Sequence, residues 1–164
     1  MNARLLVLAL LVVTCVGCGR SQQPATDAPS PTVKQASVDP NSLYARIGGL
    51  NGTARAVDAM VNHVLSDTVI LANRQLKMRA KPENVPGLKV QITNLISSMT
   101  GGHESYGGRS MKDAHRGMGV TEAQWTAFMQ DCSDGLDEAK VAAREKQEVL
   151  DLFTSMKRDI VEVP

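Results

Sequence analysis

The chain has 164 residues, and its 18 Lys and Arg against 17 Asp and Glu give a formal charge of +1. That balance gives no electrostatic reason to expect a nucleic acid as partner. Aromatic residues make up only 3% of the sequence, so Leu, Val, Ile, Met and Ala must build the core, which suits packed helices better than a sheet. Two of the three cysteines, Cys15 and Cys18, lie near the N-terminus. Cys132 is then alone in the rest of the chain, which excludes an internal disulfide framework.

Residues 1–18 have the layout of an export signal, because Arg4 precedes an apolar run over residues 5–13 and small residues follow. Nine residues are too few to cross a hydrocarbon layer about 30 Å thick. The end of the segment resembles the bacterial lipoprotein signal, in which a cysteine is acylated and becomes the new N-terminus. Cys18 fits that pattern better than Cys15, and cleavage without lipidation is the alternative. We expect an exported protein at the cell envelope or in the periplasm, with a lipid anchor at Cys18 as its sole membrane attachment.

Residues 19–41 separate this signal from the rest of the chain. The segment holds four of the seven prolines among Ser, Gln, Thr, Asp and Ala. Such a composition buries too little apolar surface to offset the entropy of ordering, so we interpret it as a flexible tether. The folded domain is expected over residues 42–164.

The spacing of apolar residues in that domain predicts helices throughout. Stripes at i, i+3, i+4 and i+7 recur four times, and no alternating segment predicts a strand. Thr121 and Gln124 are spaced as a capping box at the start of the third stripe. An all-α fold of about four main helices is therefore predicted, with stripes over residues 57–65, 88–99, 125–136 and 149–160.

Two segments fit no long helix, and we expect a site in one of them. Residues 73–84 are polar and cationic, whereas residues 101–119 hold six glycines, His103 and His115 around a short predicted helix over 110–116. Glycine at that density marks a backbone that bends sharply or approaches something closely. His115 shares a predicted helix face with Met111 and Met118, so it is either a core histidine or a ligand. His63 falls on the opposite side of its helix from the apolar stripe and is expected at the surface. Zinc clusters, a hydrolase elbow and a phosphate loop have no support in the sequence.

These segments together resemble the group I truncated haemoglobins. The opening Ser42-Leu43-Tyr44-x-Arg46-Ile47-Gly48-Gly49 is similar to that family's opening, and its glycine-rich signature is matched by Gly101-Gly102 followed by Tyr106-x-Gly108-Arg109-x-Met111-x-x-Ala114-His115. Residues 82–85 and 157–163 are similar to exported bacterial relatives. The resemblance implies a truncated, two-over-two globin fold that holds a b-type haem. His115 would be the proximal iron ligand, with Met111 and Met118 packing against the porphyrin. Tyr106 and Arg109 of the signature are included among the expected cofactor-binding residues.

The sequence departs from the family pattern on the other, distal face of the haem. Met60 and Val61 stand where the family has a Phe-Tyr pair, and Leu88 and Ile92 match further polar positions, with Gln91 between them. The family's clamping Phe has no counterpart. Three alternatives follow: an apolar distal pocket lined by Met60, Val61, Leu88 and Ile92; a second internal ligand, for which Met60 is the candidate; or a haem-free interaction module at the envelope.

The function expected from the resemblance is reversible binding of oxygen, NO or CO at a His-ligated haem b. A redox or electron-transfer haem protein is an alternative within the same family. NO dioxygenation would need an external reductase as partner, because the sequence has no flavin or nicotinamide motif. Catalysis by the chain alone is therefore not expected.

Overall fold

The computed structural model describes residues 37–163. The predicted export signal over residues 1–18 and most of the predicted tether lie outside the described residues. Residues 37–41 contain no helix, and the first helix begins at Leu43. Its N-cap is Ser42, whose Oγ accepts a hydrogen bond from the Ala45 amide at 3.1 Å. Within 37–163, no helix is both long enough and apolar enough to span a bilayer.

The described residues are helical apart from their connections and one parallel β-bridge between Thr121 and Val163. The all-α prediction is confirmed. All four predicted long helices are present among the described residues. Four short helices accompany them: one before the first long helix, two between the first and the second, and one at the end of the glycine-rich segment. In chain order the helices are α1 (Leu43–Arg46), α2 (Gly49–Ser66), α3 (Thr68–Leu71), α4 (Arg74–Arg79), α5 (Val85–Thr100), α6 (Met111–His115), α7 (Glu122–Glu138) and α8 (Ala143–Ile160).

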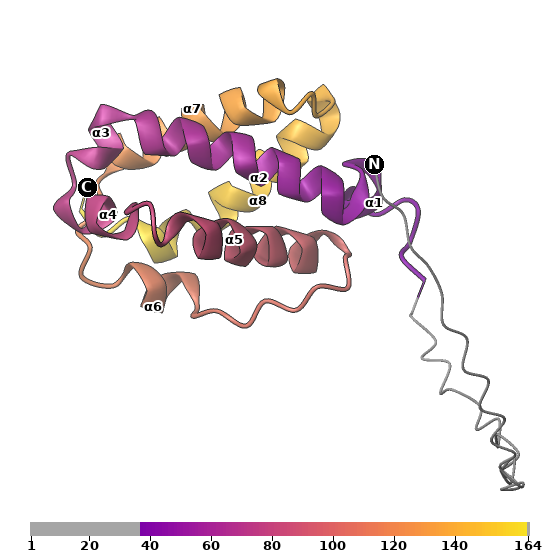
Figure 1. Cartoon of the computed structure of the whole chain (residues 1–164), viewed down its shortest axis with the longest axis horizontal. Helices are drawn as coiled ribbons and strands as arrows, with labels where there is room; N and C mark the ends of the chain where they lie inside the picture. The colour runs from indigo at the N-terminus through magenta and orange to yellow at the C-terminus, as the bar shows by residue number, and fades with distance from the viewer. Residues whose placement is uncertain (1–36, 164) are drawn as a thin grey trace, which may run out of the picture. The chain divides into compact units, whose positions relative to one another are not determined.

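The four long helices form two layers, with α2 and α5 over α7 and α8 (Figure 1). The crossing of α2 on α7 depends on Gly135, because a Cβ there would lie 2.5 Å from the backbone of Met60. This close approach brings Met60 into the core. Buried side chains from all four long helices form that core, among them Val57, Met60, Ile96, Trp125, Leu136, Val149 and Phe153.

Local signals set the helix ends. α5 begins at Val85, three residues before its predicted stripe, since Pro86 is tolerated in a first turn that needs no amide donor. It ends at Gly101, which adopts a left-handed φ of 98°. At the start of α7 the predicted capping box is confirmed: the Gln124 amide donates to Thr121 Oγ1 and the Thr121 amide donates to Gln124 Oε1, each at 3.2 Å.

The glycine-rich segment forms the long connection between α5 and α6. It runs back along the underside of α5 and leaves α6 at the edge of the domain (Figure 1). The cationic segment over residues 73–84 holds only the six-residue helix α4. Both segments therefore end beside the same cavity, whose lining includes residues of α4 and α6.

Candidate functional site

A cavity of about 310 Å³ lies between the layers and is lined by residues of all four long helices. This volume is in the range of small-molecule and cofactor sites. Aliphatic, aromatic and thioether side chains make up most of its wall. The cavity can therefore hold a largely apolar ligand that is oriented by a few polar contacts. The nitrogen- and oxygen-bearing side chains in the lining are Arg79, Gln91, Tyr106, His115, Gln124 and the indole of Trp125.

His115 is the last residue of α6 and lines this cavity half-buried. Its Nδ1 lies 2.8 Å from the carbonyl oxygen of Met111, and since a carbonyl can only accept, Nδ1 carries the proton and donates. Burial is the main cause that lowers the pKa of His115, and the positive charges of Arg79 and Arg109 lower it further. The ring is therefore held neutral, with the Nε2 lone pair left for a ligand.

The loop after His115 is fixed by a carboxylate from the C-terminal segment. The amides of Gly117 and Gly119, both at positive φ, donate to the two oxygens of Glu162 at 2.7 and 2.6 Å. These backbone donors lower the pKa of Glu162. The amides of Glu162 and Val163 also donate to the carbonyl of Val120, at 2.9 and 3.1 Å. We call the two hydrogen bonds from the Gly117 and Gly119 amides to the Glu162 carboxylate the Glu162 clamp.

The two methionines flank His115, though not as predicted. Met111 lies one turn before it in α6, whereas Met118 lies beyond the helix, because α6 ends at His115 and Gly117 turns the chain. The expectation that Met118 shares a helix face with His115 is wrong. Met118 is nevertheless buried and lines the cavity together with Met111.

Tyr106 and Arg109 of the signature have different positions. Tyr106 lines the cavity, and its hydroxyl donates to the Arg109 carbonyl at 2.7 Å. Gly108 makes this turn feasible, because a Cβ there would lie 2.4 Å from the Tyr106 hydroxyl. The exposed side chain of Arg109 is outside the cavity lining, and its link to the site is the charge that it exerts on His115.

The opposite wall comes from α2 and α5. The structure brings Met60, Val61, Leu88 and Ile92 to the same cavity, where Met60 and Val61 are buried and Leu88 is 38% exposed. Gln91 also lines the cavity and is exposed. Met60, Val61, Leu88 and Ile92 are all apolar, so the wall offers a ligand few hydrogen-bond donors.

Sequence reasoning missed part of the cavity wall. Trp125, Phe128 and Phe153 were predicted only as core residues. Their rings contact one another in sequence at tilted angles, with centroids 5.5 and 5.7 Å apart. Arg79 from the cationic segment also lines the cavity. The helical spacing of the aromatic residues was visible in the sequence. Which face of the core is hollow was not.

The remaining histidines lie away from this site. His63 is partly exposed, and its Nε2 is 3.0 Å from Glu138 Oε2, in keeping with the predicted surface position. His103 is exposed in the glycine-rich segment. Among residues 37–163 no cluster of three His, Cys, Asp or Glu side chains could hold a metal ion. A metal at His115 would therefore need most of its ligands from a cofactor.

Two helix pairs packed over one another, with a histidine at the end of a short helix facing the cavity between them, define the truncated globin class. The family model for bacterial-like globins matches residues 42–162. The chain belongs to this family.

Similar proteins of known sequence include two group 1 truncated haemoglobins. The protein from Tetrahymena pyriformis is 24% identical over 122 residues, which cover 74% of this chain and 96% of that protein. The protein from Mycolicibacterium paratuberculosis is 27% identical over 122 residues, which cover 74% of this chain and 85% of that protein.

Solved structures show the same fold. The Fe(III) form of the Tetrahymena pyriformis truncated haemoglobin superposes with a TM-score of 0.61 at 23% identity, covering 73% of this chain and 97% of that one. The group II truncated haemoglobin from Bacillus anthracis gives a TM-score of 0.65 at 16% identity, covering 77% and 95%.

Proposed function

We propose that the protein binds a b-type haem in this cavity, with Nε2 of His115 as the proximal iron ligand, and that it binds a diatomic gas. A haem would supply an iron that His115 would hold and that could bind a diatomic gas. The observation that carries the proposal is the state of His115: a neutral imidazole, held through Nδ1, beside a largely apolar cavity. Membership of the globin family supports the same cofactor.

The residues around His115 fit this cofactor. Met111 and Met118 would pack their polarisable thioethers against the porphyrin on the His115 side. Arg79 and Arg109 both act electrostatically on His115 and are exposed at their ends, so they would face the propionate carboxylates at the solvent edge. The Met111 carbonyl would keep the imidazole plane fixed while Nε2 holds the iron.

The wall of α2 and α5 would determine how a gas is held. Val61, Leu88 and Ile92 offer no hydrogen-bond donor, which leaves Gln91 as the polar side chain of α5 in the lining. A gas that carries partial negative charge, such as oxygen, would therefore be held without strong hydrogen bonding, whereas CO depends less on such a donor.

Met60 supports a second candidate function, a redox haem with two protein ligands. Its side chain is buried and lines the same cavity as His115. A thioether opposite an imidazole is an established axial pair in electron-transfer haem proteins. A ferrous spectrum that stays six-coordinate without added gas would favour this candidate.

The experiment that tests the proposal is a titration of the purified chain with ferric haem, followed by reduction and addition of CO. We expect saturation at one haem per chain and a sharp Soret band that shifts on CO addition. Absorbance that rises without saturation, as for haem adsorbed on an unrelated helical protein, would instead favour a haem-free interaction module.

We also propose that the protein is exported and anchored by an acylated Cys18. The support is the apolar run that ends at a small residue and Cys18. Cys18→Ser should move the protein from the membrane fraction to the soluble fraction, because one acylated terminus is its sole proposed attachment. An unmodified N-terminus beyond residue 18, found by mass spectrometry, would contradict the anchor.

A further inference from the structure

Six exposed cations lie beside the cavity without a partner in the folded domain. Four belong to α4 and the turn after it, and two belong to the approach to α6 and to α6 itself. None forms an ion pair with another residue of 37–163, whereas six of the other nine cations described do. We call this set the cationic rim: Arg74, Lys77, Arg79, Lys81, Arg109 and Lys112.

Positive and negative charges are concentrated in different parts of this nearly neutral chain, and the cationic rim is the positive part. Residues 74–81 carry four cations and no acid, and residues 109–116 carry Arg109, Lys112 and Arg116 against Asp113. α7 carries five acids and no Lys or Arg. Figure 1 shows α6 at the lower edge and α7 at the upper edge of the domain. The nearby acids Glu83 and Glu162 offset only part of the positive charge. A surface of this kind orients and accelerates the approach of a partner of opposite charge.

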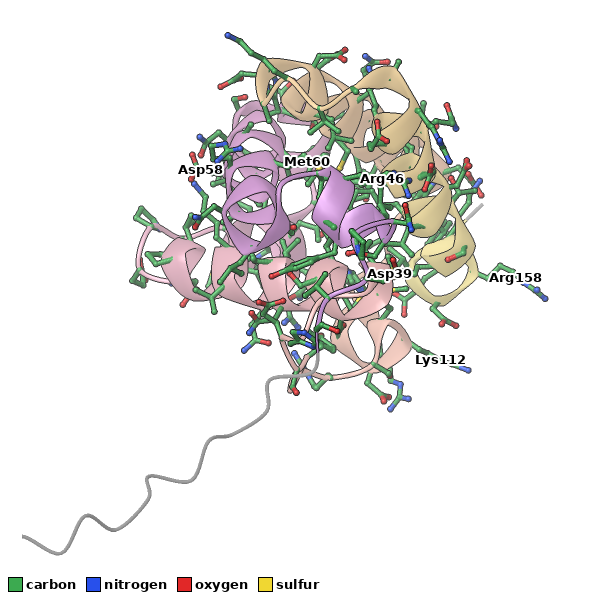
Figure 2. All side chains as sticks on the ribbon, turned by 90° about the vertical axis from the view of Figure 1, so that its right-hand side faces the viewer. Asp39, Arg46, Asp58, Met60, Lys112 and Arg158 are labelled. Carbon is green, nitrogen blue, oxygen red and sulfur yellow. The ribbon has the colours of Figure 1, made fainter. Side chains whose placement is uncertain are left out.

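The proposed haem would neutralise only part of the positive charge of the cationic rim. Its two propionates would engage Arg79 and Arg109, the two arginines whose charges act on the pKa of His115. Arg74, Lys77, Lys81 and Lys112 would remain exposed, and Figure 2 shows Lys112 pointing away from the domain. Exposed unpaired cations around a cofactor edge serve recognition better than stability, because surface charge pairs contribute little to folding.

We infer that the cationic rim is the docking surface for a protein partner with an acidic face, of the class of electron-transfer proteins that serve as external reductase. This inference rests on the proposed function, since it assigns a partner to the same cavity. A protein fits the rim better than a membrane does. Leu76 of α4 lines the cavity, which leaves Met78 as the exposed apolar side chain of that helix. A membrane-binding amphipathic helix needs a whole apolar face.

The test is calorimetric titration of the purified chain with oxidised flavodoxin, an acidic electron-transfer protein, with and without bound haem. We expect binding at low salt that weakens at least tenfold between 20 and 500 mM NaCl. Lys77→Glu/Lys81→Glu should weaken binding at low salt by about tenfold or more. The matched control Arg55→Glu/Arg158→Glu changes the net charge equally at exposed cations outside the rim, and it should change the affinity less than about twofold. Circular dichroism checks that α4 survives, and Lys112→Glu on α6 repeats the test without altering α4.

Three results would overturn the inference: no flavodoxin binding at low salt, equal loss in the control variant, or tighter binding to phosphatidylglycerol vesicles than to flavodoxin. The last result would assign the rim to a membrane. The calorimetry is also done without haem, so the two proposals can fail separately. If the chain binds flavodoxin but cannot bind haem, the proposed haem function is refuted and the docking surface is not. Haem binding without docking would refute only the rim.

Discussion

The two walls of the cavity differ in how strongly their backbone and side chains are fixed. On the α6 side, the His115 ring is hydrogen-bonded to its own helix, and the loop after it is clamped through two amides by Glu162. On the side of α2 and α5, Val61 and Ile92 contribute apolar contacts to the cavity. Polar groups specify one orientation, because each bond has a preferred direction, whereas apolar contacts tolerate exchange of side chains.

This contrast explains why the family signature survives on one side and not on the other. A change at His115 would remove a directional group that no neighbour can replace. Val61, in contrast, occupies a volume that several apolar side chains could fill. Under the proposed function, the α6 side would determine whether a haem is held, and the α2–α5 side would determine how a gas is held. Four substitutions test this division, in order of decreasing expected effect.

His115→Gly should abolish stoichiometric haem binding while leaving the helix content in place, because the substitution removes the proposed iron ligand. Added imidazole should restore a Soret band by occupying the space of the missing ring. Absorbance titration measures both effects. His63→Ala is the control, since His63 lies at the surface beside Glu138. Unchanged haem binding in His115→Gly, with loss in His63→Ala, would assign the ligand to the wrong histidine.

Val61→Tyr should slow oxygen release by about tenfold to a hundredfold, because it introduces a donor into an apolar wall and a hydrogen bond to a charged acceptor contributes roughly 1.5 to 3 kcal/mol. CO release should change less. Stopped-flow mixing measures both rates. The unmodified protein should release oxygen quickly and autoxidise readily. Slow release that persists in Gln91→Leu would mean that another donor reaches the gas.

Gly135→Ala should destabilise the domain by about 1 to 3 kcal/mol, the usual effect of overpacking. The added Cβ would lie 2.5 Å from the Met60 backbone and push α2 away from α7. Chemical denaturation measures the change. Gly87→Ala in the first turn of α5 is the control, because no atom lies within 4 Å of its Cβ position. Equal destabilisation in both variants would mean that helix geometry, and not the crossing, is responsible.

Glu162→Gln should lower the thermal stability near neutral pH and flatten its decline in acid. The pKa of Glu162 is lowered in the folded state, so its contribution is fully present above the carboxyl's ordinary pKa and is lost as the pH falls through the lowered value. Melting curves from pH 3 to 7 measure this dependence. Asp159→Asn serves as the control, because Asp159 is exposed and has no ion-pair partner among residues 37–163. An unchanged pH profile in Glu162→Gln would show that the clamp adds nothing to stability.

Periodicity and capping signals were sufficient to predict the four long helices, but not the short helices α1, α3 and α4. The stripe from Trp125 to Leu136 and the Thr121–Gln124 box became α7, because both signals depend on residues close in sequence. The His115 position was also predictable, since its signature is contiguous. Met118 was misplaced because the end of α6 depends on Gly117, whose positive φ a helical spacing rule ignores.

The Glu162 clamp and the role of Arg79 were not predictable from local pattern. Glu162 lies 45 residues from Gly117 in sequence, and no periodicity relates a helix end to a loop at that distance. Arg79 belonged to a segment interpreted only as polar and cationic. Both residues reach the site through tertiary packing, which cannot be read from local patterns in a single sequence. The hollow between the helices was hidden for the same reason.

The Glu162 clamp couples the stability of the C-terminal segment to the binding of a ligand at His115. If the clamp stabilises the ligand-bound position of His115, a ligand on His115 stabilises the clamp by the same free energy, because the coupling between two sites is the same in both directions. Ligand binding in the cavity should therefore slow hydrogen exchange at the Glu162 and Val163 amides, which donate to the carbonyl oxygen of Val120. Glu162 and Val163 would then report on the occupancy of the cavity although neither residue lines it.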